Sequence, residues 1–154
     1  MGRKFKIILV VLVGVFIVIQ FVPSQRPANE PVAGYDFIER YDVPEDVEQV
    51  LRNACFDCHS QEVNYPWYAY VAPSSWLVSR DVRIGRSNLD FSRWSELDKK
   101  DKLKLSSEIG EEVEEGNMPL PIYLLMHPGA SLDAAQRELI LQWTEQLAEK
   151  ILEE

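Results

Sequence analysis

Both cysteines of this 154-residue chain and one of its two histidines lie within five positions, in the segment NACFDCHS at residues 53–60. Cys55 and Cys58 are three residues apart, and His59 directly follows the second cysteine. Residues three apart lie on the same side of one helical turn. A fold that makes this segment helical therefore presents two thiols and an imidazole from a single turn of backbone.

Three other uses of paired cysteines fit this segment less well. A thioredoxin-like redox pair starts a helix that follows a strand, whereas this pair comes at the end of a predicted helix. Structural zinc needs four ligands, and beyond these three residues the chain offers only His127. Because His59 directly follows Cys58, a closed tetrahedron of these four residues is hard to build. A disulfide in an oxidising compartment stays possible, but it closes a very small loop and leaves the adjacent histidine without a role.

The pattern C-x-x-C-H is the attachment signature of c-type haem. Two thiols on one side of a turn can form thioethers to the two vinyl groups at the porphyrin edge. The histidine after them is then carried under the ring, where its imidazole coordinates the iron. The sequence therefore predicts one covalent haem c, with its iron, held by Cys55, Cys58 and His59.

The first 22 residues differ in composition from the rest of the chain. Arg3, Lys4 and Lys6 precede an apolar run at residues 7–22. This run is longer than most signal-peptide cores, and no good cleavage site follows it. Residues 1–22 are thus predicted to be a signal anchor or transmembrane helix of the cytoplasmic membrane. The basic residues before the run place the rest of the chain on the periplasmic side, and cleavage would export it.

Two further segments follow the predicted anchor. Residues 23–42 contain three prolines without any periodic pattern, which predicts a flexible linker. Residues 43–154 form the predicted haem-binding domain. The whole chain carries a net charge of −9 and the first 22 residues carry +3, so the remainder carries −12. Such acidity argues against nucleic acid as a partner. It either favours a basic patch on a protein partner or only keeps the domain soluble, and the second role is weighted at least equally.

The predicted domain is all-α, because helical periodicity recurs along it and no segment has the pattern of a strand. Helices are expected after Pro44, from Ser75 to a stop at Gly85, at residues 97–115 before Gly116, and after a cap at Ser131.

Several segments together resemble a family of small bacterial c-type haem-binding domain proteins. They are NACFDCHS, YPWYAYVAPSSWLVSRDV, GNMP, and the Tyr123-x-x-x-His127-Pro128 sequence that leads into the last helix. The resemblance covers roughly residues 40–150. It implies a cytochrome c-like helical fold that carries one covalent haem.

Three residues are candidates for the sixth iron ligand. Met118 is preferred because it follows a predicted helix end, precedes Pro119 in a stiff loop, and lies in a G-x-M-P segment that resembles the distal loop of small cytochromes c. His127 is the alternative, although a structural role is expected for it first. Met126 lies beside apolar residues and is expected to fill the core.

Aromatic and basic residues that follow the motif are secondary candidates. The aromatic residues either line the haem or belong to the general core, and these two roles are weighted equally. They are Tyr65, Trp67, Tyr68, Tyr70 and Trp76. Three arginines step by three along a short predicted helix, where they either pair with haem propionates or form a solvated face, the second being favoured; they are Arg80, Arg83 and Arg86.

The predicted function is that of an electron carrier and not of an enzyme. Iron with two protein ligands changes oxidation state with little rearrangement and has no room for a substrate. The expected partners are periplasmic or membrane redox proteins. The alternative is a gas sensor or small peroxidase-like protein with an open or weakly held sixth iron site. A third possibility is a module whose haem is structural and whose surface binds a protein.

Overall fold

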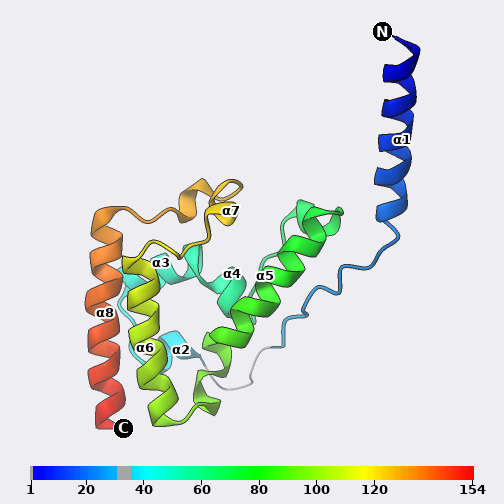
Figure 1. Ribbon diagram of the computed structural model, residues 1–154. Coiled ribbons are helices and arrows are strands. Elements are labelled where there is room, and N and C mark those ends of the chain that lie inside the picture. Colours follow the sequence, from blue (N-terminus) through cyan, green and yellow to red (C-terminus); the bar gives the residue numbers. More distant parts are fainter. Residues whose placement is uncertain (1, 31–35) are drawn as a thin grey trace.

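The computed structural model describes residues 2–30 and 36–154 (Figure 1). The described chain folds into α-helices and short 3-10 helices, with no strand, so the all-α prediction is confirmed. The α-helices are α1 (Arg3–Ile19), α2 (Phe37–Arg40), α3 (Glu45–Ala54), α4 (Phe56–His59), α5 (Ser74–Asn88), α6 (Lys99–Glu114), α7 (Pro121–Leu124) and α8 (Ala134–Glu153). The 3-10 helices are η1 (Trp67–Tyr70), η2 (Phe91–Glu96) and η3 (Pro128–Ala130).

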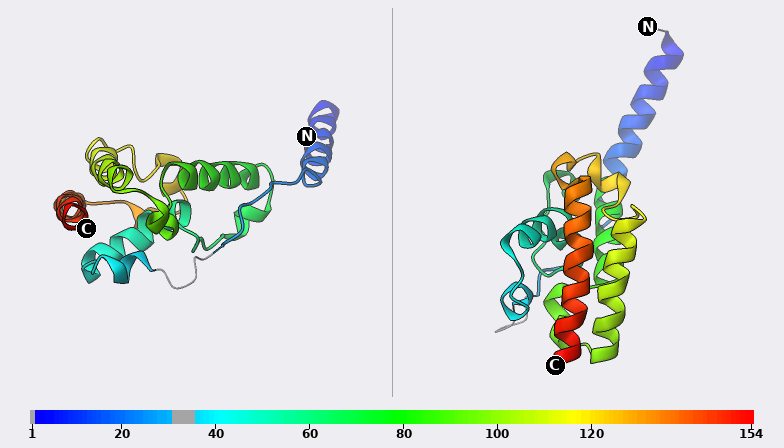
Figure 2. Two further views of the ribbon diagram at one scale, coloured as in Figure 1. Left: turned by 90° about the horizontal axis from the view of Figure 1, so that it is seen from below. Right: turned by 90° about the vertical axis from the view of Figure 1, so that its left-hand side faces the viewer.

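Helices α6 and α8 run side by side in opposite directions (Figures 1 and 2). Each begins at an aspartate whose side chain accepts a backbone N–H of the first turn, Asp98 for α6 and Asp133 for α8. The cap of α8 is therefore two residues later than the predicted Ser131. Helix α6 ends as predicted, because Gly116 takes a positive φ of 74° just after it.

An aromatic core joins this helix pair to α2, α3 and η2. Trp94 is fully buried, and its indole N–H donates a hydrogen bond to the Tyr41 hydroxyl at 3.1 Å. The ring of Phe37 packs against those of Trp94, Phe91 and Tyr41. The apolar face of helix α3 packs against this core and consists of Val47, Val50 and Leu51. Since α3 leads directly into the C-x-x-C-H segment, the core fixes where that segment begins.

Helix α5 packs against α4 and η1 and continues to Asn88. It therefore passes through Gly85, where the sequence predicted a stop. Gly85 is buried, and a Cβ built at this position would lie 2.5 Å from the carbonyl oxygen of Cys58. This glycine permits a close approach between two backbones and does not terminate a helix.

The C-terminal part of α5 lies beside α4, where Gly85 meets the backbone of Cys58. Figure 1 shows the two helices next to each other at the centre of the molecule. The segment with the cysteines is thus held between α3, which precedes it, and the end of α5.

Helix α1 projects away from the other helices (Figures 1 and 2), and all of its side chains are exposed except that of Ile19, which is partly so. It has 17 residues, which at 1.5 Å per residue is about 25 Å, against about 30 Å for the hydrocarbon core of a bilayer. None of the described helices combines the length and the apolar character needed to cross a membrane. The membrane-spanning helix predicted within residues 1–22 is therefore not found.

The segment predicted as a flexible linker, residues 23–42, differs from that expectation in its described parts. Phe37 and Tyr41 belong to the aromatic core, so folded structure begins before residue 43. Residues 23–30 have no regular secondary structure but make hydrogen bonds to the domain. Residues 31–35 lie outside the described residues.

We expect Leu51→Ala to lower the free energy of unfolding by about 2–5 kcal/mol, because the leucine is fully buried and its removal leaves a cavity. Leu152→Ala is the matched control, since Leu152 is 61% exposed, and it should change stability by about 0.5 kcal/mol or less. Urea unfolding of both variants, compared in the same haem state, measures the difference. Equal losses in the two variants would contradict the described core.

Candidate functional site

The C-x-x-C-H segment forms one turn at the junction of α3 and α4. The backbone N–H groups of Cys58 and His59 both donate to the carbonyl of Cys55, at 3.1 and 2.9 Å. Both cysteines are free thiols, so the structure contains no disulfide between them. The predicted grouping of two thiols and an imidazole on a single turn is therefore present.

His59 is oriented by the residue that follows α5. Its Nδ1 lies 3.1 Å from the carbonyl oxygen of Leu89. With the proton on Nδ1, this contact is a hydrogen bond that leaves the Nε2 lone pair available to a metal. Burial lowers the pKa of His59, although its hydrogen bonds to backbone carbonyls act in the opposite direction. A neutral imidazole with a fixed tautomer is the form that binds iron.

The two thiols belong to partly buried cysteines and are held in their neutral form. Burial raises the pKa of Cys55 to about 12, with a smaller contribution from Cys58. Burial also raises the pKa of Cys58 to about 11, and the carboxylates of Asp57 and Asp81 add to the effect. Cys55 packs against the hydrophobic core, whereas Cys58 faces a cavity.

That cavity has a volume of about 290 Å³ and lies between the C-x-x-C-H turn, α5 and α7. Its walls are mostly apolar, with Val78 and Val82 of α5 on one side. Tyr65 and Tyr68, from the segment before and within η1, form another part of the wall. An apolar cavity at the side of Cys58 suits the apolar part of a ligand, and its lining residue Leu125, which is 74% exposed, shows that it is open to solvent at α7.

His127 lines the same cavity from a position shortly after α7. Its ring stacks on that of Tyr123, with centroids 4.0 Å apart and planes 15° apart. Its Nδ1 lies 3.3 Å from the Tyr123 carbonyl oxygen, and the Tyr68 hydroxyl lies 3.3 Å from each ring nitrogen. Both histidines of the chain can therefore donate from Nδ1 to a backbone carbonyl, the arrangement usual for metal-binding histidines.

A hydrogen bond connects the C-x-x-C-H turn to α7. The Tyr123 hydroxyl donates to Asp57 Oδ2 at 2.9 Å, and Asp57 Oδ1 accepts the backbone N–H of Asn64 at 3.1 Å. Burial raises the pKa of Tyr123, and the Asp57 carboxylate adds to the effect. Sequence reasoning assigned neither residue a role at the site, because Asp57 occupies a variable position of the motif and Tyr123, named only as part of the family resemblance, lies 66 residues away from it.

The other predicted site residues are dispersed. Met118 is partly buried after α6, where its N–H donates to the Glu112 carbonyl at 3.1 Å, and it does not line the cavity. Met126 does line it, although it was expected to fill the core. Trp67 is 73% exposed, and the Trp76 indole N–H donates to the Val22 carbonyl. Of the five aromatic candidates for lining the haem, Tyr65 and Tyr68 line the cavity, and the other three do not; these are Trp67, Tyr70 and Trp76.

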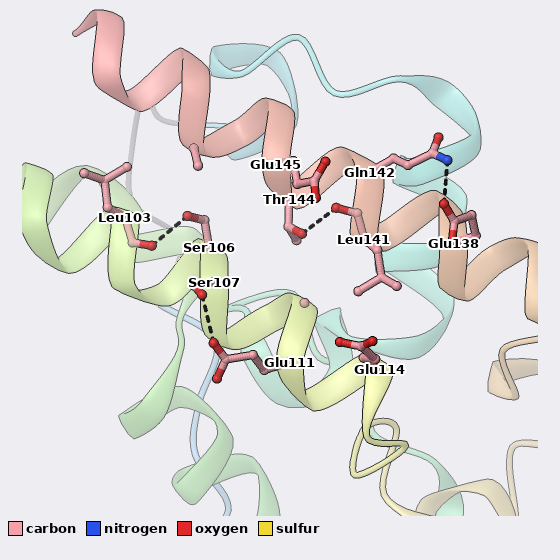
Figure 3. Close-up of a pocket in the computed structure, with 12 residues that line it drawn as sticks. Leu103, Ser106, Ser107, Glu111, Glu114, Glu138, Leu141, Gln142, Thr144 and Glu145 are labelled. Atoms are coloured by element: carbon pink, nitrogen blue, oxygen red, sulfur yellow. Dashed lines mark hydrogen bonds between the residues drawn. The ribbon is translucent and has the colours of Figure 1, made fainter.

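A second hollow lies between α6 and α8 and contains no residue of the motif (Figure 3). Glutamates line it from both helices, and they are Glu111, Glu114, Glu138 and Glu145. It contains no thiol or imidazole among its described lining residues, so it offers no ligand set for haem iron.

Of the C-x-x-C-H residues only Cys58 lines the first cavity, whereas Cys55 and His59 lie on the same turn outside its lining. The residues of this turn and of the cavity fit a haem by the chemistry of their donors. Cys55 and Cys58 supply two unpaired thiols on one turn, and His59 supplies an imidazole with its Nε2 available. His127 supplies a second imidazole to the lining of the cavity.

Comparison with known proteins supports haem binding. Residues 14–146 match the model of the haem-binding domain family, and the chain belongs to that family. The match begins within α1 and includes residues 23–30, which were predicted as linker. No significant match was found among curated proteins or among solved structures.

We expect Gly85→Ala to lower both haem content and the free energy of unfolding, the latter by about 1–3 kcal/mol, because the added methyl group collides with the Cys58 carbonyl. Gly129→Ala is the control, since nothing lies within 4 Å of the Cβ that it adds. Haem absorbance per chain and urea unfolding measure the two effects. A Gly85→Ala protein that resembles Gly129→Ala would refute the close contact.

The raised thiol pKa values predict slow alkylation of the folded, haem-free protein. At pH 8 the rate with iodoacetamide should be on the order of a hundredfold below that of an unfolded control, because the thiolate is the nucleophile. The rate should then increase as pH rises toward about 11 for Cys58. Mass spectrometry of the modified peptide follows the reaction. Alkylation at the rate of the unfolded chain would show that the thiols are not desolvated.

Proposed function

We propose that this protein is a monohaem c-type cytochrome that carries single electrons. Cys55 and Cys58 hold the haem through thioethers, and His59 binds the iron from the proximal side. When bound, the haem supplies an iron that accepts and releases one electron. The observation that carries the proposal is the single turn with two free thiols and His59, whose Nδ1 faces the Leu89 carbonyl. A cytochrome c-like arrangement of the helices around the haem is part of the same proposal.

For the sixth iron position we propose His127 in preference to Met118, which the sequence favoured. Two observations support this choice. His127 lines the cavity next to Cys58, and its Nδ1 can donate to the Tyr123 carbonyl, which leaves Nε2 for the iron. Two histidine ligands give a lower reduction potential than a histidine and a methionine. The carrier would then work toward the more reducing end of the c-type range.

We further propose that α1 attaches the protein to the cytoplasmic membrane, with the haem domain on the periplasmic side. In the structure the apolar side chains of α1 are exposed to solvent, Val10 at 71% and Val18 at 65% for example. Apolar side chains of this kind are stable against lipid, and the preceding Arg3, Lys4 and Lys6 suit anionic headgroups. The partners are then membrane or periplasmic redox proteins.

Two observations favour a second candidate, a gas sensor or small peroxidase-like protein. The Tyr68 hydroxyl lies within 3.3 Å of both ring nitrogens of His127, so it can hold this imidazole away from the iron. Leu125, which also lines the cavity, is 74% exposed, which leaves a route for small molecules. In this case the sixth position is open or weakly held.

The pyridine haemochrome spectrum of the purified holoprotein should be that of a c-type haem with two thioether bonds, and carbon monoxide should bind slowly or incompletely to the reduced protein. Cys58→Ala should change the haemochrome spectrum, because one vinyl group then stays unsaturated. Rapid, stoichiometric carbon monoxide binding would support the sensor. Absence of haem from protein made in a host with c-type maturation would rule out both functions.

His127→Ala should open the sixth position, so that the ferric protein becomes high-spin and the reduced protein binds carbon monoxide quickly. Met118→Ala is the matched comparison and should keep the low-spin spectrum, because Met118 does not line the cavity. Optical and electron paramagnetic resonance spectra separate the two outcomes. A high-spin Met118→Ala protein beside a low-spin His127→Ala protein would reverse the assignment.

A further inference from the structure

The described segment before residue 31 lies along the haem-site part of the domain as a strap, which we define as residues 20–30. At its start, the Gln20 side chain pairs with both backbone groups of Ala72, donating at 3.1 Å and accepting at 2.9 Å. Farther along, Arg26 donates to the Ala69 carbonyl at 2.9 Å, and its guanidinium lies 3.8 Å from the ring centroid of Tyr70. These are side-chain contacts to backbone and ring groups of the domain, unlike those of a free tether.

The second half of the strap contacts the segment that contributes Val63 and Tyr65 to the cavity wall. The Tyr65 hydroxyl donates to the Pro27 carbonyl at 2.7 Å, and the Asn29 side chain donates to the Val63 carbonyl at 3.0 Å. The backbone N–H of Glu30 donates to Oε1 of the buried Gln61 side chain at 3.0 Å. Since Val63 and Tyr65 line the cavity, the strap lies directly behind its wall.

Arg86 joins the strap to the C-x-x-C-H turn. Its Nε donates to the Ser60 carbonyl at 2.9 Å, one residue after His59. Its other two nitrogens donate to the strap, one to the Ala28 carbonyl at 2.6 Å and one to Asn29 Oδ1 at 2.9 Å. One guanidinium thus contacts both parts, and its planar shape suits three acceptors in different directions.

The charge of Arg86 is not neutralised by a carboxylate within the described residues. All three of its hydrogen-bond acceptors are neutral, and it takes part in none of the ion pairs found there. Its effect reaches the cavity wall, because burial raises the pKa of Tyr65 while the charges of Arg86 and Arg26 oppose that rise. A positive charge beside a haem favours the reduced iron, which has the lower positive charge.

We propose that Arg86 is a positioning residue that fastens the strap to the haem-attachment turn and that its unneutralised charge raises the reduction potential of the haem. The strap is then part of the haem site, and the segment that follows α1 is held by the domain. The part that concerns the potential rests on the proposed function. The fastening of the strap does not.

The test uses the full-length holoprotein and three substitutions on α5. Arg86→Gln removes the charge and the three-way contact. Arg86→Lys keeps the positive charge, but its single ammonium group cannot reach all three acceptors that the guanidinium of Arg86 contacts. Arg83→Gln is the matched control, because it removes the same charge from the same helix, and Arg83 is exposed and makes none of the strap contacts.

Hydrogen exchange at the strap and the midpoint potential are the two measurements. Arg86→Gln should exchange faster at the Glu30 amide and have a lower midpoint potential. Arg86→Lys should exchange faster with a smaller fall in potential, and Arg83→Gln should match the wild type in both. Wild-type exchange at Glu30 in Arg86→Gln would overturn the fastening, and an equal fall in potential in Arg83→Gln would overturn the local charge effect.

Three further samples keep the outcomes separable. Asn29→Ala removes both side-chain contacts of Asn29, to Arg86 and to Val63, whereas Asn29→Asp keeps an acceptor for Arg86 and loses only the donor to Val63. Both leave α5 intact. Faster exchange at Glu30 in Asn29→Ala than in Asn29→Asp supports the fastening even when Arg86→Gln does not fold, and equal exchange in the two contradicts it. The haem-free chain is measured in parallel. If the protein never takes up haem, the proposed function and the potential effect fail together, while exchange in that chain still decides whether Arg86 holds the strap.

Discussion

The position of the C-x-x-C-H turn depends on its contact with the end of α5. Three residues at the end of α5 or just after it contact residues 58–60. Gly85 lies against the Cys58 carbonyl, and the Leu89 carbonyl faces His59. Arg86 donates to the carbonyl of Ser60, which directly follows the turn. The first contact sets the distance between the two backbones, and the second sets the rotation of the imidazole. The thiols and the imidazole are therefore held in position by contacts within the protein itself, which lowers the entropic cost of haem binding.

Sequence reasoning was most successful where the pattern is local. Helical periodicity identified α3, α6 and α8, and the spacing of Cys55, Cys58 and His59 identified the turn that presents them. It was less successful where distant backbones meet. Glycine commonly ends a helix, but Gly85 lies within α5, where its lack of a Cβ allows the backbone of Cys58 to approach closely. Residues 23–30 show no periodic pattern of apolar residues, yet they are held to the domain by hydrogen bonds, which require no such pattern.

The cavity wall illustrates the same limit. Trp67 and Trp76 were candidates either to line the haem or to fill the core, and they are instead directed to the exterior and to the strap, respectively. Tyr65 and Tyr123 do line it, because each of their hydroxyl groups has a partner, the Pro27 carbonyl for the first and a carboxylate of the motif for the second. A polar end that finds a partner allows an aromatic ring to stay at the edge of an apolar cavity. Those partners are distant in sequence, and so no local pattern reveals them.

The central claim is that one haem is bonded through sulfur to this chain. Intact-mass spectrometry under denaturing conditions tests it most directly, on protein produced in a host that carries out c-type maturation. The account predicts a mass equal to the polypeptide plus one haem, with the added mass retained on the peptide that contains Cys55 and Cys58. A denatured chain with the mass of its amino acids alone would contradict the account.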